Sequence, residues 1–360
     1  MERQILQIVP RLPPSLCGVG DQATILAGEL RDGHDIKSRF LVCDPSWTPS
    51  PVGFDFECHH VKARTSHSLQ TFLEKNAEKI EAIIVQYSGY GFASRGAPVW
   101  LANGLSSWRR LHPKVALVSM YHELFSSGRV TTSSFWLQPL QKWVVRKLAK
   151  TSTSVRTNRT AYQNWLARSL HVQTEKVIAM PVFSNFGETL DLASLGPKKN
   201  QMVVQGLGRT GDVAQSLACL ERLVAQTGTE LTKVIGPPPR IPISSSLRLE
   251  YTGHLPNEGV AQLLRESRRG YVDYYPRYFG KSSIHAAYCA HGLAAYTFGQ
   301  PDDSQDGIRH GQQFFDMARE EKLPDAMEEI RLGEEAHSWY QGHNIRATAH
   351  SYADQLLAPC

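Results

Sequence analysis

The chain has 360 residues, of which 41% are hydrophobic and 20% are charged, and its formal net charge is +5. This composition excludes a disordered chain, and the length predicts two domains because single hydrophobic cores stop growing at about 250–300 residues. The basic residues are spread along the chain rather than clustered, which disfavours nucleic-acid binding and fits an anionic ligand or an anionic membrane surface equally well.

Short apolar runs typical of strands alternate with helical patterns in the first half of the chain. The expected strands are residues 5–9, 38–43, 82–86 and 115–120, and the expected helices are residues 21–31, 69–79 and 98–111. Apolar strands with little alternation, separated by helices, indicate a parallel sheet that is covered on both faces. The first half is therefore predicted to be a doubly wound α/β domain.

The same pattern begins again after a seam near residues 182–195. The expected strands are residues 202–205, 232–235, 247–251, 271–275 and 294–298, and the expected helices are residues 212–227, 257–267 and 282–291. These patterns predict two Rossmann-like α/β domains, residues 1–183 and 184–344, that face each other across a cleft. Residues 339–357 are expected to form one or two helices, and the C-terminal helix, residues 345–360, is expected to pack back on the first domain. Ligands should bind in the crevice at the carboxyl ends of the strands.

The six cysteines lack C-x-x-C spacing, which argues against a zinc site and against a redox motif. In a chain of this length they are expected to be reduced thiols of a cytosolic protein. The N-terminal residues are interpreted as a first strand rather than a signal peptide, and no run of about 18 apolar residues is present to span a bilayer. The predicted location is cytoplasmic.

The most informative segment is residues 274–293, in which a strand ends at two tyrosines and Gly280 precedes a helix. The free backbone N–H groups at the start of such a helix suit a phosphate or a diphosphate. Lys281, Ser282 and Ser283 add a cation and two hydroxyls at the same place. The alternative interpretation is an ordinary strand–loop–helix connection whose glycines are caps.

The loop after the first strand contains Gly18, Gly20 and Ala23, which formally match the dinucleotide fingerprint G-x-G-x-x-A. The fingerprint requires its first glycine directly after the strand, whereas eight residues, including three prolines, lie between the strand and Gly18. We therefore expect no nicotinamide or flavin cofactor. The glycines instead predict a close approach of the backbone to a ligand phosphate or an acceptor. The alternative is a solvent loop with Asp21 as the helix N-cap.

Two further side chains follow predicted strands. His122 lies after residues 115–120, where a histidine in the cleft can move a proton or orient a hydroxyl. Arg209 follows the first strand of the second domain, where a guanidinium can hold two phosphate oxygens. The alternatives are a structural histidine and a surface arginine.

Asp302 and Asp303 are the only adjacent acidic pair in a loop-like context that could suggest a divalent metal. Because the pair lies among Gly, Pro, Ser and Gln residues rather than directly at a strand end, we interpret it as part of a solvated loop and predict no metal.

Residues 136–150 form an amphipathic and basic helical pattern. The residues on one side of this helix are Trp136, Leu140, Trp143, Val144 and Leu148, and Lys142, Arg146 and Lys150 lie along another. Such a helix can lie on an anionic bilayer. The alternative is a helix that packs on the core and keeps its basic face in solvent.

Taken together, several segments resemble retaining, nucleotide-sugar-dependent glycosyltransferases of the GT-B type, near family 4. The resemblance follows the order of the family's motifs and covers nearly the whole chain. The segments that carry it are residues 18–30, 121–124, 206–209, 234–238, 249–255 and 278–293.

The resemblance implies a nucleoside-diphosphate sugar as donor, a hydroxyl acceptor on a saccharide, lipid carrier or metabolite, retention of the anomeric configuration, and no metal or cofactor. The first domain would bind the acceptor and the second the donor. The residues implied as catalytic are His122, Arg209 and Lys281, and those implied in donor binding are Gly18, Gly20, His254, Gly280, Ser282 and Ser283.

Three positions depart from the family pattern. Arg277 and His285 stand where two glutamates, eight positions apart, are expected, and Ala214 stands where a lysine is expected. We expect Lys281 to replace the missing phosphate cation. The departures keep two other classes open, a non-catalytic GT-B relative that binds a sugar nucleotide or a partner, and a Rossmann oxidoreductase.

Overall fold

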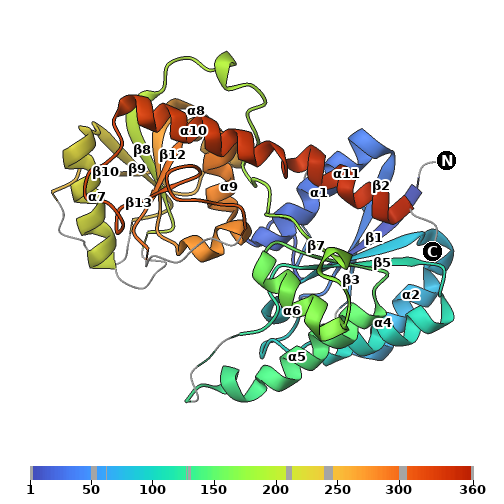
Figure 1. The fold of residues 1–360 in the computed structure, drawn as a ribbon. Helices are drawn as coiled ribbons and strands as arrows, with labels where there is room; N and C mark the ends of the chain where they lie inside the picture. The colour runs from blue at the N-terminus through green and yellow to red at the C-terminus, as the bar shows by residue number, and fades with distance from the viewer. Residues whose placement is uncertain are drawn as a thin grey trace. The chain divides into compact units, whose positions relative to one another are not determined.

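The computed structural model describes residues 3–49, 55–61, 63–126, 128, 131–207, 213–238, 246–299 and 306–357. The chain forms two units (Figure 1). Unit 1 comprises Met1–Met180 together with Ile345–Cys360, and unit 2 comprises Pro181–Asn344. The division falls close to the predicted boundary between residues 183 and 184. Helix α11 (Ile345–Leu357) packs against α1 (Gly18–His34) of unit 1.

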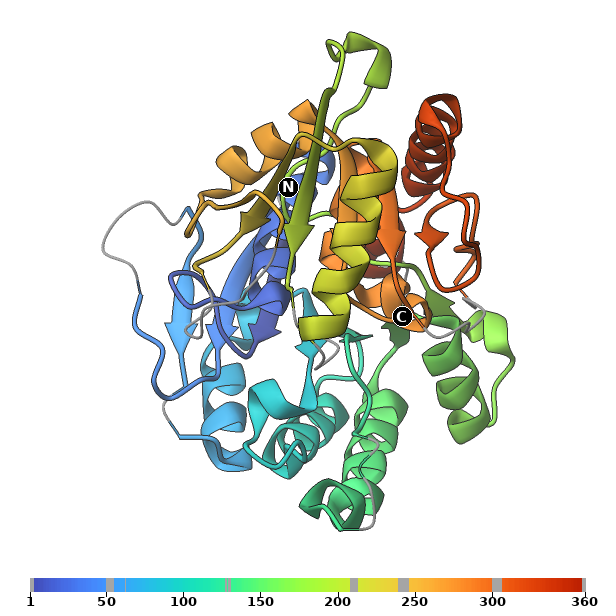
Figure 2. The same cartoon turned by 90° about the vertical axis from the view of Figure 1, so that its left-hand side faces the viewer.

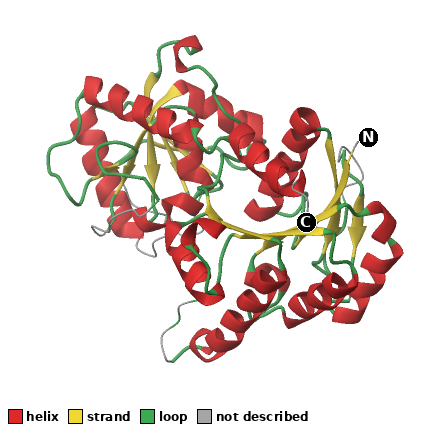
Figure 3. Cartoon of the chain, turned by 45° about the vertical axis from the view of Figure 1, so that its right-hand side comes forward, coloured by secondary structure: helices red, strands yellow, loops and turns green. Residues whose placement is uncertain are grey.

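Unit 1 contains a parallel sheet with strand order β3-β2-β1-β4-β5-β6-β7. Its strands are β1 (Arg3–Val9), β2 (Ile36–Val42), β3 (Cys58–His60), β4 (Ala82–Tyr87), β5 (Ala116–Tyr121), β6 (Ser154–Thr157) and β7 (Val177–Ala179). Its remaining helices are α2 (Ser66–Lys75), α3 (Gly89–Phe92), α4 (Val99–Leu111), α5 (Ser133–Thr151) and α6 (Thr160–Leu170). Helices α1 and α11 cover one face of the sheet, and α2, α4, α5 and α6 cover the other (Figures 1 and 3).

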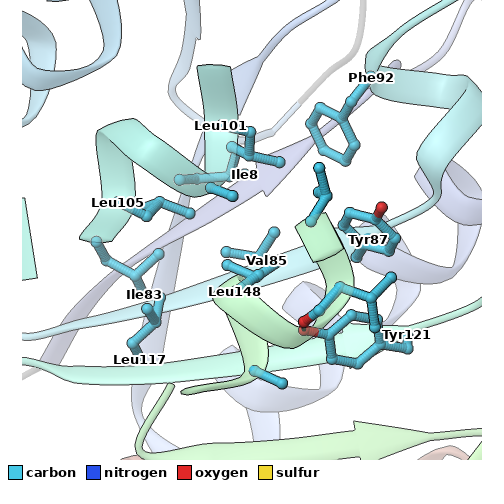
Figure 4. Packing of buried hydrophobic residues seen from close by; sticks show 14 of the residues in the cluster. Ile8, Ile83, Val85, Tyr87, Phe92, Leu101, Leu105, Leu117, Tyr121 and Leu148 are labelled. Atoms are coloured by element: carbon cyan, nitrogen blue, oxygen red, sulfur yellow. Dashed lines mark hydrogen bonds between the residues drawn. The ribbon is translucent and has the colours of Figure 1, made fainter. Parts of the chain in front are cut away.

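The core of unit 1 forms because both faces of its central strands are covered. Every residue of β4 and β5 is buried. Ile83 and Val85 of β4 pack with Leu101 and Leu105 of α4 and Leu148 of α5 (Figure 4). Each such side chain contributes roughly 1.5–3 kcal/mol by leaving water, so burial on two faces explains why these strands are continuous apolar runs.

Unit 2 repeats the topology of unit 1. Its parallel sheet has the order β10-β9-β8-β11-β12-β13. The strands are β8 (Lys199–Gln205), β9 (Leu231–Ile235), β10 (Leu249–Tyr251), β11 (Ser267–Val272), β12 (Ala294–Thr297) and β13 (Phe315–Asp316). The helices are α7 (Val213–Thr227), α8 (Asn257–Glu266), α9 (Ser283–Ala290) and α10 (Ala326–Gln341). In both units the first and fourth strands are neighbours, which is the Rossmann order.

Alternation along β8 assigns the two faces of this sheet. Met202 and Val204 pack with α7, whereas Val203 packs with α8 and α9. Figure 2 shows α7 in front of the strands and α8 behind them. The doubly wound arrangement predicted for residues 184–344 is thus present.

The predicted elements differ from the observed ones at short strands and at three helices, since α3, α6 and nearly all of α10 were not predicted. No sequence pattern predicted β3, β6, β7 or β13, because these strands have two to four residues and no long apolar run. Helix α1 begins at Gly18 rather than at Asp21, so Asp21 lies in the first turn and Cys17 occupies the N-cap position. Residues 339–357, predicted as one or two helices, contain the end of α10 and all of α11.

Gly20 is required by close packing at the start of α1. A Cβ atom at this position would collide with the carbonyl oxygen of Arg11 in the loop after β1. Because this obstacle is backbone, it cannot move aside as a flexible side chain would. At Gly28, farther along the same helix, a Cβ atom would meet no other part of the described chain within 4 Å.

We therefore expect Gly20→Ala to lower the free energy of unfolding by about 1–3 kcal/mol, through displacement of the loop or of α1. Gly28→Ala is the matched control and should raise stability by up to about 1 kcal/mol, because alanine is the better helix former. Urea denaturation of both variants measures the difference. Equal stability of the two variants would contradict the close approach.

Candidate functional site

The strand order defines where a ligand can bind in unit 2. At the carboxyl ends of β8 and β11 the connections leave toward opposite faces of the sheet, which opens a crevice between them. The loop after β8 includes Gly206, whose φ of 72° is in the left-handed region, and Leu207. Arg209, predicted to hold the diphosphate, lies outside the described residues. The loop after β11 is described throughout.

This second loop contains the predicted helix start. A 3-10 turn (Pro276–Lys281) leads into α9, and Gly280 is buried, with its carbonyl accepting a hydrogen bond from the Val182 N–H at 2.9 Å. The hydroxyl oxygen of Ser282 accepts from the backbone N–H of His285 at 3.2 Å, so Ser282 is the N-cap of α9. One lone pair of its oxygen therefore accepts from the helix, and its O–H hydrogen is left to donate to a ligand.

Two cations lie beside this helix start. The Lys281 ammonium is 5.2 Å from the centroid of the Tyr278 ring, and the Arg277 guanidinium is 5.1 Å from the same ring. Arg277 is exposed and also lies 5.2 Å from the Tyr275 ring. The loop that in the resembled family carries a glutamate thus carries two positive groups, held over aromatic faces by cation–π attraction.

His285 occupies the other position where a glutamate was expected, and it belongs to the core. Its side chain is fully buried, stacks on Phe279 at 4.3 Å and has Nε2 3.2 Å from the carbonyl oxygen of Gln313. Burial lowers the pKa of His285 to about 4, so the ring is neutral near pH 7. This side chain is therefore part of the core and does not replace the missing carboxylate.

His254, predicted in donor binding, is exposed in the loop after β10. Its neighbour Gly253 exchanges two backbone hydrogen bonds with Gly236, at 3.0 and 3.1 Å. The ends of β9 and β10, which lie in two of the segments that carry the family resemblance, are thus held together at the carboxyl ends of the strands.

In unit 1, His122 ends a chain of buried polar side chains that crosses four neighbouring strands. Its Nε2 is 2.9 Å from Oε1 of Gln86 on β4. The Gln86 amide donates to Oε1 of Gln7 on β1 at 3.0 Å, and the Gln7 amide donates to the hydroxyl of Ser38 on β2 at 3.0 Å. All four side chains are buried.

The direction of this chain assigns the tautomer of His122. Because Gln86 uses its amide hydrogens toward Gln7, its oxygen must accept from Nε2–H of His122. The other ring nitrogen, Nδ1, then carries the lone pair and makes no hydrogen bond with the described residues. Burial lowers the pKa of His122 to about 4, so at neutral pH the ring is uncharged and suited to orienting a hydroxyl rather than to donating a proton.

Reasoning from the sequence missed Gln7, Gln86 and Ser38. The signal that could have found the glutamines is their place inside apolar strands, since an uncharged amide in such a run requires a buried partner. Gly18 is the first residue of α1, and the Cα of Gly20 faces the Arg11 carbonyl. The structure therefore accounts for Gly20 by packing, and its predicted contact with the donor stays a prediction.

The predictions about metals have separate outcomes. Asp302 and Asp303 lie outside the described residues. Within the part of the chain that the structure describes, no three His, Cys, Asp or Glu side chains are grouped so that they could hold a metal ion.

Helix α5 exposes several apolar side chains on the surface of unit 1. Trp136, Leu140 and Trp143 are 74%, 42% and 43% exposed, whereas Val144 and Leu148 are fully buried. The five apolar residues predicted to share one side are thus divided between surface and core. No helix among the described residues combines the length and the apolar character needed to cross a membrane.

No protein-family model matches the sequence, and no curated protein is significantly similar to it. Solved structures are similar over nearly the full length. An alpha-glucosyltransferase (AGT) in complex with UDP matches with a TM-score of 0.59 and 11% identity, covering 99% of this chain and 100% of that one. The lipopolysaccharide outer core galactosyltransferase WaaB gives 0.60 and 10%, covering 98% and 99%. The fold is GT-B.

The same fold also occurs in a different class of enzyme. UDP-GlcNAc 2-epimerase from Neisseria meningitidis, bound to UDP-GlcNAc, matches with a TM-score of 0.58 and 10% identity, covering 98% of this chain and 99% of that one. The GT-B architecture predicted from the sequence is therefore confirmed, whereas family 4 and a retaining mechanism remain predictions.

Buried histidines make unit 2 sensitive to acid. Burial lowers the pKa of His285 and His291 to about 4 and that of His343 to about 3. Unfolding returns each ring to water, where its pKa is about 6.5, so between these values the unfolded chain binds more protons than the folded one. The contribution of these histidines to the free energy of unfolding is fully present above pH 6.5, and it is lost as the pH falls toward 4.

We expect each histidine to lower the free energy of unfolding by about 1.4 kcal/mol per pH unit within this window. His285→Phe should reduce the slope of the free energy of unfolding against pH by the contribution of about one proton, compared with wild type. Urea denaturation at several pH values between 4.5 and 7.5 measures the slopes. An unchanged slope in His285→Phe would show that this ring is protonated in the folded state.

Proposed function

We propose that the chain transfers a sugar from a nucleoside-diphosphate sugar to an acceptor hydroxyl. The observation that carries the proposal is the cationic helix start of residues 277–283, which lies at the carboxyl end of β11 in a GT-B fold. A GT-B fold alone does not distinguish transfer from other chemistry on sugar nucleotides. The charge at this loop adds the feature that a leaving diphosphate requires.

The proposed reaction breaks the bond between the anomeric carbon and the terminal phosphate oxygen, and forms a bond from that carbon to the acceptor oxygen, whose proton passes to the leaving diphosphate. Negative charge grows on the diphosphate in the transition state. Lys281, the N-terminus of α9 and, in the proposal, Arg209 stabilise that charge, so no metal ion is needed. Transfer with retention follows from the resemblance to family 4.

His122 is assigned to the acceptor or to the transferred sugar. Its neutral ring, with Nε2–H held by Gln86, offers the Nδ1 lone pair to a hydroxyl. Gly18, Gly20, Gly280, Ser282, Ser283 and His254 remain the proposed contacts to the donor.

A thermal-shift screen with nucleoside diphosphates and their sugars tests the donor site, because a ligand that binds only the folded state raises the melting temperature. Lys281→Ala should weaken nucleotide binding severalfold, since it removes a cation from the helix start. Lys322→Ala removes an exposed lysine elsewhere in unit 2 and is the matched control. Equal affinities of wild type and Lys281→Ala would reject the role of Lys281.

Epimerisation of the donor sugar is the second candidate function, because two classes of solved structure share this fold. Incubation with the bound nucleotide sugar, followed by NMR, separates the classes. Acceptor-dependent release of the nucleoside diphosphate supports transfer, and a change at the sugar C2 without an acceptor supports epimerisation. Binding without either reaction identifies a non-catalytic relative.

The acceptor panel has to be broad. Saccharides, lipid-linked saccharides and small metabolites follow from the resemblance. Duplex DNA is included because the alpha-glucosyltransferase, which has this fold, was solved with UDP-glucose and DNA containing an abasic site. Transfer to DNA would overturn the expectation that nucleic acid is not a partner.

We further propose that α5 contacts an anionic bilayer from the cytoplasmic side. Trp136, Leu140 and Trp143 are exposed at intervals of one helical turn or two, and Arg146 and Lys150 are exposed farther along the helix. Exposed tryptophans are rare on a purely solvated helix and suit the interface of a membrane.

The protein should therefore sediment with vesicles rich in phosphatidylglycerol more than with phosphatidylcholine vesicles. Replacing Trp136 and Trp143 together by Ser should reduce the bound fraction severalfold, because both aromatic anchors are lost. Leu111→Ser, which removes a 73% exposed apolar side chain from α4 of the same unit, is the control and should bind as wild type does. Full binding by the double variant would reject α5 as the contact.

A further inference from the structure

Unit 2 also contains a cavity at the amino ends of its strands, whereas the loop of residues 277–283 lies at the carboxyl end of β11. A cavity of about 350 Å³ lies between the segment that precedes β8, the start of β11 and helix α10. Its apolar walls include Leu192, Leu195 and Ile330. Lys198 precedes β8 and Arg268 is the second residue of β11, so both stand at the amino ends of parallel strands. The volume is within the range of small-molecule sites.

Lys198 is fixed inside this cavity by the end of α9. Its ammonium donates to the carbonyl oxygens of His291 and Gly292, both at 2.6 Å. His291 is the C-cap of α9 and Gly292 follows it, so the ammonium caps the C-terminal end of the helix. Two of the three N–H groups are used, and the third has no acceptor among the described residues. The charge is thus anchored at one place in the hollow.

Arg268 adds a second positive group, in contrast to its neighbour Arg269. Arg269 is buried and bonded to Glu329 at 2.5 and 2.8 Å, and Tyr296 also donates to Glu329 at 2.7 Å. Glu329 lines the cavity, yet its carboxylate is engaged by these groups. Arg268 makes no hydrogen bond or ion pair with the described residues and is partly buried. Glu334 is exposed at the rim, which leaves the interior positive.

We propose that this cavity binds a small carboxylate with an apolar body. The carboxylate would accept from the third N–H of Lys198 and from Arg268, and the apolar body would lie against Leu192, Leu195 and Ile330. An inorganic anion would leave the apolar walls hydrated, and a neutral apolar molecule would leave Arg268 and the third N–H of Lys198 without an acceptor. Carboxylates of short aliphatic or aromatic acids combine the two properties within this volume.

The electrostatics of Lys198 provide an independent readout. Burial lowers the pKa of Lys198 to about 7. The charged or titratable groups around it are Arg268 on β11, Glu329 and Glu334 on α10, and His291 after α9. A carboxylate beside the ammonium favours its charged form and raises that pKa. Binding near pH 7.5 should therefore take up protons from the buffer.

Calorimetric titration with hexanoate and benzoate tests the proposal, with hexanamide and benzamide as neutral analogues of the same shape. We expect the carboxylates to bind at least about 10-fold more tightly than the amides, since a charge-assisted hydrogen bond is worth about 1.5–3 kcal/mol. Repeating the titration in buffers of different ionisation enthalpy measures the protons taken up.

Arg268→Gln should weaken carboxylate binding about 10-fold or more without changing amide binding. Lys198→Arg keeps the cation but cannot lose its proton near neutral pH, so it should bind carboxylate without proton uptake. If Lys198→Arg fails to fold, the carboxylate affinity of Arg268→Gln tests the proposal by itself.

Equal binding of carboxylate and amide, absence of carboxylate binding, or unchanged affinity in Arg268→Gln would overturn the proposal. Nucleotide binding by the same Arg268→Gln protein should match wild type, which keeps this result separate from the proposed transferase function.

Discussion

Both candidate sites of unit 2 depend on the packing of α9 against the sheet. Tyr288 lies in the middle of this helix, and its hydroxyl donates to the carbonyl oxygens of Val203 and Tyr271, at 3.1 and 3.2 Å. The ring lies against Gly270 of β11, where a Cβ atom would stand 2.5 Å from it. Glycine at this position thus lets the ring reach the carbonyls of two adjacent strands. The start of α9, which carries Lys281 and Ser282, and its end, which Lys198 caps, are placed by this one contact.

Burial between two layers of helices makes the polar residues of both sheets depend on one another. An unpaired amide or ring nitrogen in such a place costs about 1–3 kcal/mol, which favours hydrogen bonds between neighbouring buried side chains. In unit 1 this requirement produces the chain from His122 through Gln86 and Gln7 to Ser38. In unit 2 it produces the Arg269–Glu329 pair, in which two well-formed hydrogen bonds offset the desolvation of both charges. The polar networks are therefore consequences of the doubly wound fold and also fix the orientation of His122.

The sequence predicted the parts of the structure that depend on local pattern. The apolar runs of β4, β5 and β8 predicted parallel strands, and residues 282–291 predicted α9 to within one residue at each end, because a glycine and a serine punctuate that helix. The sequence could not show that His285 belongs to the core, since its burial follows from the rotation of α9 on the sheet. The sequence also did not reveal the cavity at Lys198, because its walls come from four separate segments spread over residues 192–334. Such features depend on which residues are neighbours in the folded chain, and residue type alone does not reveal them.

The departures from the family pattern separate two tasks that its loop performs together. In this chain the loop keeps positive charge, from Lys281 and Arg277, beside a helix N-terminus, which is what a diphosphate requires. It lacks the carboxylates that would accept hydrogen bonds from donor hydroxyls. A glutamate at position 285 would be enclosed between Phe279 and the Gln313 carbonyl, where an ionised carboxyl has no cation to compensate its desolvation. In the proposed function, this loop would therefore neutralise the leaving diphosphate, and any carboxylate that binds the sugar would come from outside it.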